Sequence, residues 1–152
     1  MIAEADASDP AAEAESDENA PKEFGELVTS DSMFLLKKEQ KKSGLDSTAH
    51  VIKDRGAGWT RAFPAANKSA QQMMQDMLQF TGGQRIKRWY SDGADEIHAA
   101  CVEMGIRHDV AELNRHESNG VIERANRTVI EGTRTVLYQS GLPYKYWPEA
   151  ME

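Results

Sequence analysis

The sequence has a single cysteine, Cys101, and no long apolar run. One cysteine excludes an internal disulfide and is typical of a reducing compartment. The apolar stretches are far shorter than the roughly 20 residues of a membrane-spanning helix, so we expect no membrane partner. Residues 1–20 contain no Lys or Arg and no apolar middle, which also argues against a secretory signal.

Acidic residues are concentrated at one end of the chain. The net charge is −7, and residues 1–20 contain seven acidic side chains. Residues 21–152 are left with 18 acidic against 18 basic side chains. A segment rich in Ala, Glu, Asp and Ser cannot bury enough apolar surface to order itself. The sequence therefore predicts a disordered acidic tail over 1–21 and a neutral domain over 22–152, whose charge neither requires nor excludes a polyanionic partner.

Apolar periodicity predicts the order of the secondary-structure elements. Strands are expected over 27–36, 49–54, 59–63, 86–91 and 106–110. Helices are expected over 68–80, over 97–104 ahead of Gly105, and over 120–140 ahead of Gly141 and Pro143. In the last helix, the stripe expected on the sheet is Ile122, Ala125, Val129, Gly132 and Val136.

Three adjacent strands followed by strands that alternate with helices predict an α/β fold. We expect a five-stranded mixed sheet, with an antiparallel meander followed by parallel strands and with helices at its sides. In such a sheet, side chains at strand ends and at neighbouring helix starts converge at one edge.

Three acidic residues fall at the expected functional edge. Asp31 belongs to the first strand, Asp92 follows the fourth, and Glu123 lies in the first turn of the last helix. Clustered carboxylates repel unless a cation compensates them, and Mg²⁺ prefers oxygen ligands. An alternative remains open for Glu123, because an acid is also favoured there by the helix dipole and can pair with Arg127.

Local motifs add a family resemblance. Residues 90–97 (YSDGADEI), 101–108 (CVEMGIRH) and 118–127 (SNGVIERANR) resemble, in that order, the catalytic core of copia-type retrotransposon integrases. Residues 28–31 (VTSD) resemble the strand that carries the first acid of that family. The interval between Asp92 and Glu123 is shorter than in most of the family.

The resemblance implies an RNase H-like fold with a metal-binding triad of Asp31, Asp92 and Glu123. Asp54 is the rival for the first ligand. Two Mg²⁺ or Mn²⁺ ions are implied, with cleavage near the 3′ end of element DNA and transfer of that end into target DNA. DNA is therefore the expected partner, the nucleus the expected location, and a homo-oligomer an open expectation.

Four further residues are implied to contact DNA. Arg124 and Arg127 would bind phosphates, although Arg127 could instead pair with Glu123. Ser118 and Asn119 would form a lip over the target strand, or alternatively cap the last helix.

The histidines do not predict a zinc site. His98 and Cys101 share a helical face and His108 and His116 flank the fifth strand, but no Cys-x-x-Cys is present.

The chain ends where the resembled cores begin another helix, so we expect a core truncated at its C-terminal end. Two alternatives follow. One is a catalytically inactive remnant or interaction module, and the other is an RNase H-like nuclease that cuts RNA–DNA hybrids.

Overall fold

A computed structural model describes residues 20–35, 46–111 and 120–151. They form a five-stranded sheet in the order β3-β2-β1-β4-β5. The strands are β1 (Val28–Phe34), β2 (Thr48–Asp54), β3 (Thr60–Ala65), β4 (Arg88–Ser91) and β5 (Arg107–Val110). The β1–β2 and β2–β3 pairs are antiparallel, and the β1–β4 and β4–β5 pairs are parallel. The predicted mixed sheet is confirmed.

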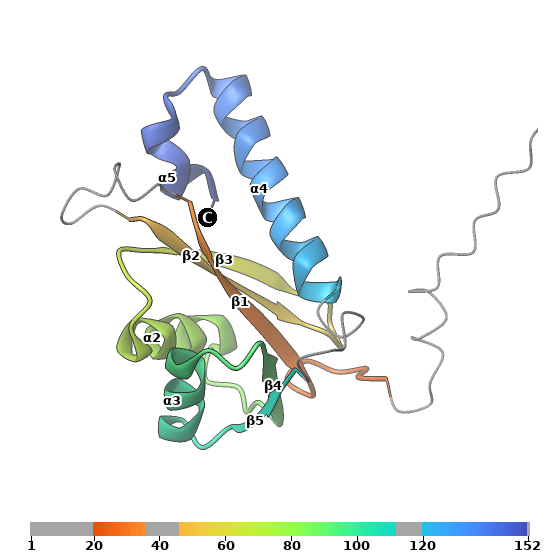
Figure 1. Cartoon of the computed structure of the whole chain (residues 1–152). Coiled ribbons are helices and arrows are strands. Elements are labelled where there is room, and N and C mark those ends of the chain that lie inside the picture. The colour runs from red at the N-terminus through yellow and green to blue at the C-terminus, as the bar shows by residue number, and fades with distance from the viewer. Residues whose placement is uncertain (1–19, 36–45, 112–119, 152) are drawn as a thin grey trace, which may run out of the picture.

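Helices cover both faces of the sheet. Helices α2 (Ala70–Thr81) and α3 (Asp95–Glu103) lie on one face, and α4 (Gly120–Ser140) and α5 (Trp147–Met151) lie on the other (Figure 1). The face under α2 and α3 packs the larger apolar cluster, which includes Ile52, Phe63, Met73, Met77, Trp89, Ile97 and Cys101. The face under α4 and α5 packs Ala49, Val51, Ala62, Ile122, Ala125, Leu137, Trp147 and Met151.

Strand alternation assigns individual side chains to these two faces. Successive side chains of a strand point to opposite faces, and directly paired residues share a face. Val51 belongs to the α4 face and Ile52 to the α2 face. Asp31 pairs with Val51, so it lies on the α4 face, whereas Ser32 pairs with His50 and lies on the α2 face.

Helix α2 begins and ends as its sequence predicts. The Ser69 side chain accepts a hydrogen bond from Gln72 N, which satisfies one of the free amides of the first turn. Gly82 ends the helix with φ of 56°, a left-handed conformation that favours glycine. Met73 and Met77 are buried in the core, as expected for a methionine stripe at helical spacing.

The buried stripe of α4 differs from the prediction in its second half. Ile122 and Ala125 are buried, but Thr133 and Leu137 continue the stripe, and Val136 is 48% exposed. From Ala125 the buried and half-buried side chains advance in steps of four, through Val129 and Thr133 to Leu137.

The C-terminal residues add two short elements that periodicity did not predict. A 3-10 helix, η3 (Tyr144–Tyr146), leads directly into α5, where Trp147 is buried against the sheet. Within the described residues, no helix combines the length and apolar character needed to cross a membrane. Most of the expected acidic tail, and all of 36–45 and 112–119, fall outside the described residues.

Candidate active site

Asp31 is held at the centre of the sheet by a contact with α4. Asn126 Nδ2 donates a hydrogen bond of 2.7 Å to Asp31 Oδ2. The other carboxylate oxygen, Oδ1, accepts the backbone N–H of Ser32 at 2.7 Å. The Asp31 carboxylate is therefore fixed on the face that α4 covers.

Asp92 directly follows β4, the strand that pairs with β1. The parallel ladder pairs Val28 with Trp89 and Thr29 with Tyr90. Continuing this register by two residues places Asp31 opposite Asp92, and alternation from Tyr90 puts Asp92 on the same face. Asp92 is exposed, and its Oδ1 accepts the N–H of Ala94 at 3.2 Å, which turns the chain into α3.

Glu123 lies on α4, three residues before Asn126. Residues three apart on a helix are neighbours on its surface, so Glu123 occupies the turn next to the one that contacts Asp31. Its side chain is exposed. Register and helix spacing thus place Asp31, Asp92 and Glu123 on the side of the sheet that α4 covers, a region called the acidic edge below.

The acidic edge presents oxygen donors, from Asp31, Asp92 and Glu123. Carboxylate oxygens are the ligands Mg²⁺ prefers. Asn126 Oδ1 is buried and has no hydrogen-bond partner among the described residues. In the part of the chain that the structure describes, no three His, Cys, Asp or Glu side chains converge closely enough to hold one ion.

Asp54 has a different role from Asp31. Its side chain is fully buried. Asp54 of β2 pairs with Val28 of β1, whose side chain lies on the α2 face. Asp54 Oδ2 accepts Gly25 N at 2.8 Å and Oδ1 accepts Ala57 N at 2.7 Å. Both oxygens hold backbone turns, and Asp54 lies on the α2 side of the sheet, opposite the side that bears Asp31.

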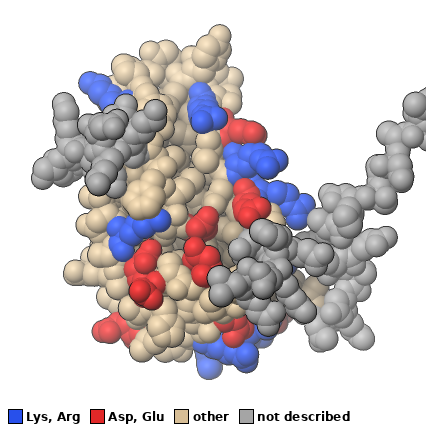
Figure 2. Space-filling view, in the orientation of Figure 1, with Lys and Arg blue, Asp and Glu red and all other residues tan. Residues whose placement is uncertain are grey.

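The predicted DNA-contacting residues are only partly described. Arg124 and Arg127 are exposed on α4, where basic and acidic side chains are interspersed (Figure 2). None of the ion pairs among the described residues joins Arg127 to Glu123. The alternative role for Arg127 as a partner of Glu123 is thus not observed. Ser118 and Asn119 lie outside the described residues.

Asn126 is the residue that the sequence reasoning missed. Asn126 belongs to the motif over 118–127 that carries the family resemblance, but the motif alone indicates no role for it. Its position one turn beyond Glu123 was the available signal, because a side chain there faces the same edge.

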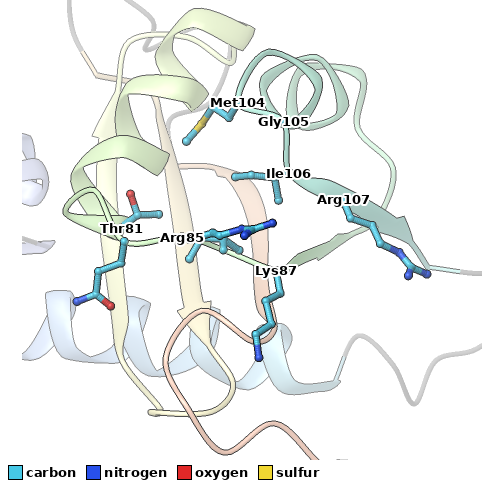
Figure 3. A pocket seen from close by; sticks show the side chains of 9 residues that line it. Thr81, Arg85, Lys87, Met104, Gly105, Ile106 and Arg107 are labelled. Atoms are coloured by element: carbon cyan, nitrogen blue, oxygen red, sulfur yellow. The ribbon is translucent and has the colours of Figure 1, made fainter.

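A pocket lies at the ends of β4 and β5 that are opposite Asp92. This pocket of about 420 Å³ is lined by Arg85, Lys87, Arg107 and Met104 among others. Figure 3 shows Arg85 extending across it, while the guanidinium of Arg107 points away. Lys87 pairs with Glu26 at 3.0 Å and Arg107 with Asp109 at 2.9 Å. The pocket is separate from the acidic edge.

The sequence is similar to parts of two known polyproteins. The chain is 36% identical over 75 residues, 46% of its length, to the retrovirus-related Pol polyprotein from transposon TNT 1-94 of Nicotiana tabacum. It is 28% identical over 107 residues, 66% of its length, to the retrovirus-related Pol polyprotein from transposon RE1 of Arabidopsis thaliana. This chain is similar in sequence to segments of retrotransposon Pol polyproteins. It spans only 6% and 7% of those two relatives. No protein-family model matches it.

Solved structures show a similar fold. The catalytic core domain of BIV integrase matches with a TM-score of 0.59 and 20% identity, covering 84% of this chain and 78% of that one. The HTLV-2 integrase catalytic core domain in complex with magnesium matches with a TM-score of 0.62 and 16% identity, covering 88% and 82%. The fold is that of integrase catalytic cores, in the RNase H-like class, and the resemblance seen in the motifs is confirmed.

Proposed function

We propose that this chain is a retrotransposon integrase core that cleaves near the 3′ ends of element DNA and joins those ends to target DNA. The observation that carries the proposal is the Asp31–Asn126 hydrogen bond, which holds the first acid on the face and near the turn of α4 that bears Glu123. Sequence similarity to Pol polyproteins and the integrase-core fold support it.

In this proposal Asp31, Asp92 and Glu123 bind two Mg²⁺ ions and do not themselves attack the DNA. Ions held there would supply activation of the attacking oxygen and stabilisation of the leaving oxygen of a phosphodiester. Asp31 is positioned by Asn126 and by Ser32 N, so its carboxylate keeps one orientation. Asp92 and Glu123 are exposed, so both are accessible to a DNA strand at the edge of the sheet.

The DNA backbone would lie along the first turns of α4. Arg124 and Arg127 are exposed there, and a guanidinium binds phosphate oxygens through charge-assisted hydrogen bonds. Ser118 and Asn119 precede this helix in the sequence and are proposed to contact the target strand. Such contacts position the DNA without reading its sequence.

A strand-transfer assay tests the proposal. The full chain is incubated with labelled element-end DNA, target DNA and Mg²⁺ or Mn²⁺. We expect Asp92→Asn to reduce joined product by at least about 100-fold, the loss typical when a group that stabilises the transition state is removed. Asp95→Asn is the matched control, because it removes one exposed acid three residues away and outside the proposed site.

Each outcome of the assay selects one function. Joined product that is lost in Asp92→Asn and kept in Asp95→Asn supports the integrase. Equal background in all three proteins supports an inactive remnant or an interaction module. Cutting restricted to RNA–DNA hybrids supports an RNase H-like nuclease.

Partners and location follow from this proposed chemistry. DNA is the proposed partner, the nucleus the proposed location, and a homo-oligomer the proposed assembly. An HTLV-2 integrase core related in fold is described in dimeric and trimeric forms.

A further inference from the structure

Two histidines from separate elements meet beside the acidic edge. His98 of α3 and His108 of β5 approach with their Nδ1 atoms 3.1 Å apart. The two rings are 5.4 Å apart between centroids and inclined by 37°. Helix α3 and strand β5 lie side by side at the end of the sheet (Figure 1). A contact of this length needs either a proton or a cation between the two nitrogens.

The second nitrogen of His108 has a partner of its own. His108 Nε2 lies 2.8 Å from Ser91 Oγ, and that hydroxyl oxygen also accepts Gly93 N at 3.3 Å. When Nε2 carries the proton and donates it to Ser91, the lone pair of Nδ1 is directed at His98. Metal-binding histidines are commonly oriented in this way, with the other ring nitrogen donating to an oxygen acceptor.

The charge state of His108 suits a metal ligand. Desolvation by burial and the neighbouring His98 lower the pKa of His108 from 6.5, against opposing effects of Asp109 and Asp92. The lowered pKa favours the neutral form of the imidazole. A neutral imidazole is the form that binds metal.

The spacing of the two nitrogens fits one ion. Zinc–nitrogen bonds of about 2.0–2.1 Å at a tetrahedral angle separate two ligand nitrogens by about 3.3–3.4 Å. The observed 3.1 Å is a few tenths shorter. His98 is exposed, so a small rotation of its side chain supplies the difference.

We propose that His98 and His108 bind a divalent transition-metal ion of the Zn²⁺ class, each through Nδ1, with solvent filling the remaining positions. The site differs from the acidic edge in its nitrogen ligands, which suit Zn²⁺ and not Mg²⁺. Cys101 does not contribute, because it is fully buried and burial raises the pKa of its thiol to about 12. With two protein ligands, the affinity is lower than that of a four-ligand structural site.

Metal binding at this site would join α3 to β5 next to a proposed catalytic acid. Ser91, the hydrogen-bond partner of His108, directly precedes Asp92. The ion would therefore restrain the turn that carries Asp92 without binding to that carboxylate.

Titration of the tag-free full chain with Zn²⁺ tests the site, by calorimetry and by ¹⁵N NMR of the imidazole nitrogens. We expect the His108 Nδ1 signal to shift, and His98→Ala and His108→Ala each to weaken Zn²⁺ affinity about tenfold or more. Val102→Ala, an exposed change one turn along α3, and Glu123→Gln, a change at the acidic edge, should leave that affinity unchanged. Millimolar Mg²⁺ should not displace the Zn²⁺.

His98→Ala gives the decisive result, because His98 is exposed and its removal leaves the Ser91–His108 contact intact. Wild-type Zn²⁺ affinity in this variant would overturn the proposal and leave the histidine contact as a simple hydrogen bond. Loss of Zn²⁺ binding in Glu123→Gln would overturn it too, since the ion would then belong to the acidic edge.

Discussion

Asn126 of α4 donates a 2.7 Å hydrogen bond to Asp31 of β1, joining residues 95 positions apart in the sequence. Because the acceptor is a carboxylate, we expect Asn126→Ala to lower the free energy of unfolding by about 1.5–3 kcal/mol. Strand transfer should also fall, and a higher Mg²⁺ concentration should be needed for half-maximal activity. Chemical denaturation and a Mg²⁺ titration of activity measure these effects. Thr128→Ala, an exposed change on the same helix, is the control, and an unchanged Mg²⁺ requirement in Asn126→Ala would contradict the positioning role.

Asp31 and Asp54 should separate activity from stability. Asp31→Asn is expected to abolish strand transfer and to lower the thermal midpoint less than Asp54→Asn does, because Asp31 is only half-buried and water can satisfy the donor that the amide leaves unpaired. Asp54→Asn should lower the unfolding free energy by about 1–3 kcal/mol, since an amide presents one acceptor to two backbone N–H donors. Thermal melts and activity per folded molecule distinguish the two variants. The opposite pattern would make Asp54 the first metal ligand.

A buried His–Asp pair should be a large contributor to stability. His50 of β2 contacts Asp76 of α2 through Nδ1 and Oδ2, and both side chains are almost completely buried. Asp76→Ala should lower the unfolding free energy by about 1–3 kcal/mol more than the control below, because it leaves the buried Nδ1 of His50 without a hydrogen-bond partner. Gln72→Ala is the control, since it removes only a 3.0 Å hydrogen bond to Asp76 and should cost about 1 kcal/mol. Equal losses in urea denaturation would contradict a special role for the pair.

Glu26 should make stability depend on acid pH. Backbone N–H groups of Lys22 and Glu23 and the Lys87 ammonium lower the pKa of Glu26 from 4.5 to about 2. A lowered folded-state pKa means that the stabilisation is complete above pH 4.5 and is lost as the pH falls from 4.5 through about 2. The thermal midpoint of the wild type should therefore fall in this range more steeply than that of Glu26→Gln. Parallel curves for the two proteins would exclude this contribution.

The order of elements was predictable because it follows from local periodicity. Alternating apolar residues predicted β1 to β3, and the helix predicted over 120–140 matches α4. The stripe on α4 was predicted correctly only to Val129, since the choice between Val136 and Leu137 depends on the twist of the sheet beneath. Local sequence contains no information on that twist.

Side-chain contacts between distant elements were not predictable. The position of Asp92 directly after β4 was predictable because the apolar pattern fixes where that strand ends, whereas Asp31 lies in the middle of β1. The contact of Asn126 with Asp31, and of His98 with His108, depends on how helices dock on the sheet. Likewise, nothing in the sequence near His50 indicated that it would be buried against Asp76.

The sheet has a seam between its antiparallel and parallel halves, where β1 and β4 share only two paired positions. Trp89 crosses this seam by donating a 2.7 Å hydrogen bond from Nε1 to Ser30 Oγ. Asp31 belongs to one half and Asp92 to the other, so the acidic edge cannot exist before the halves dock. During refolding, strand-transfer competence should therefore never precede the change in tryptophan fluorescence that accompanies burial of Trp89.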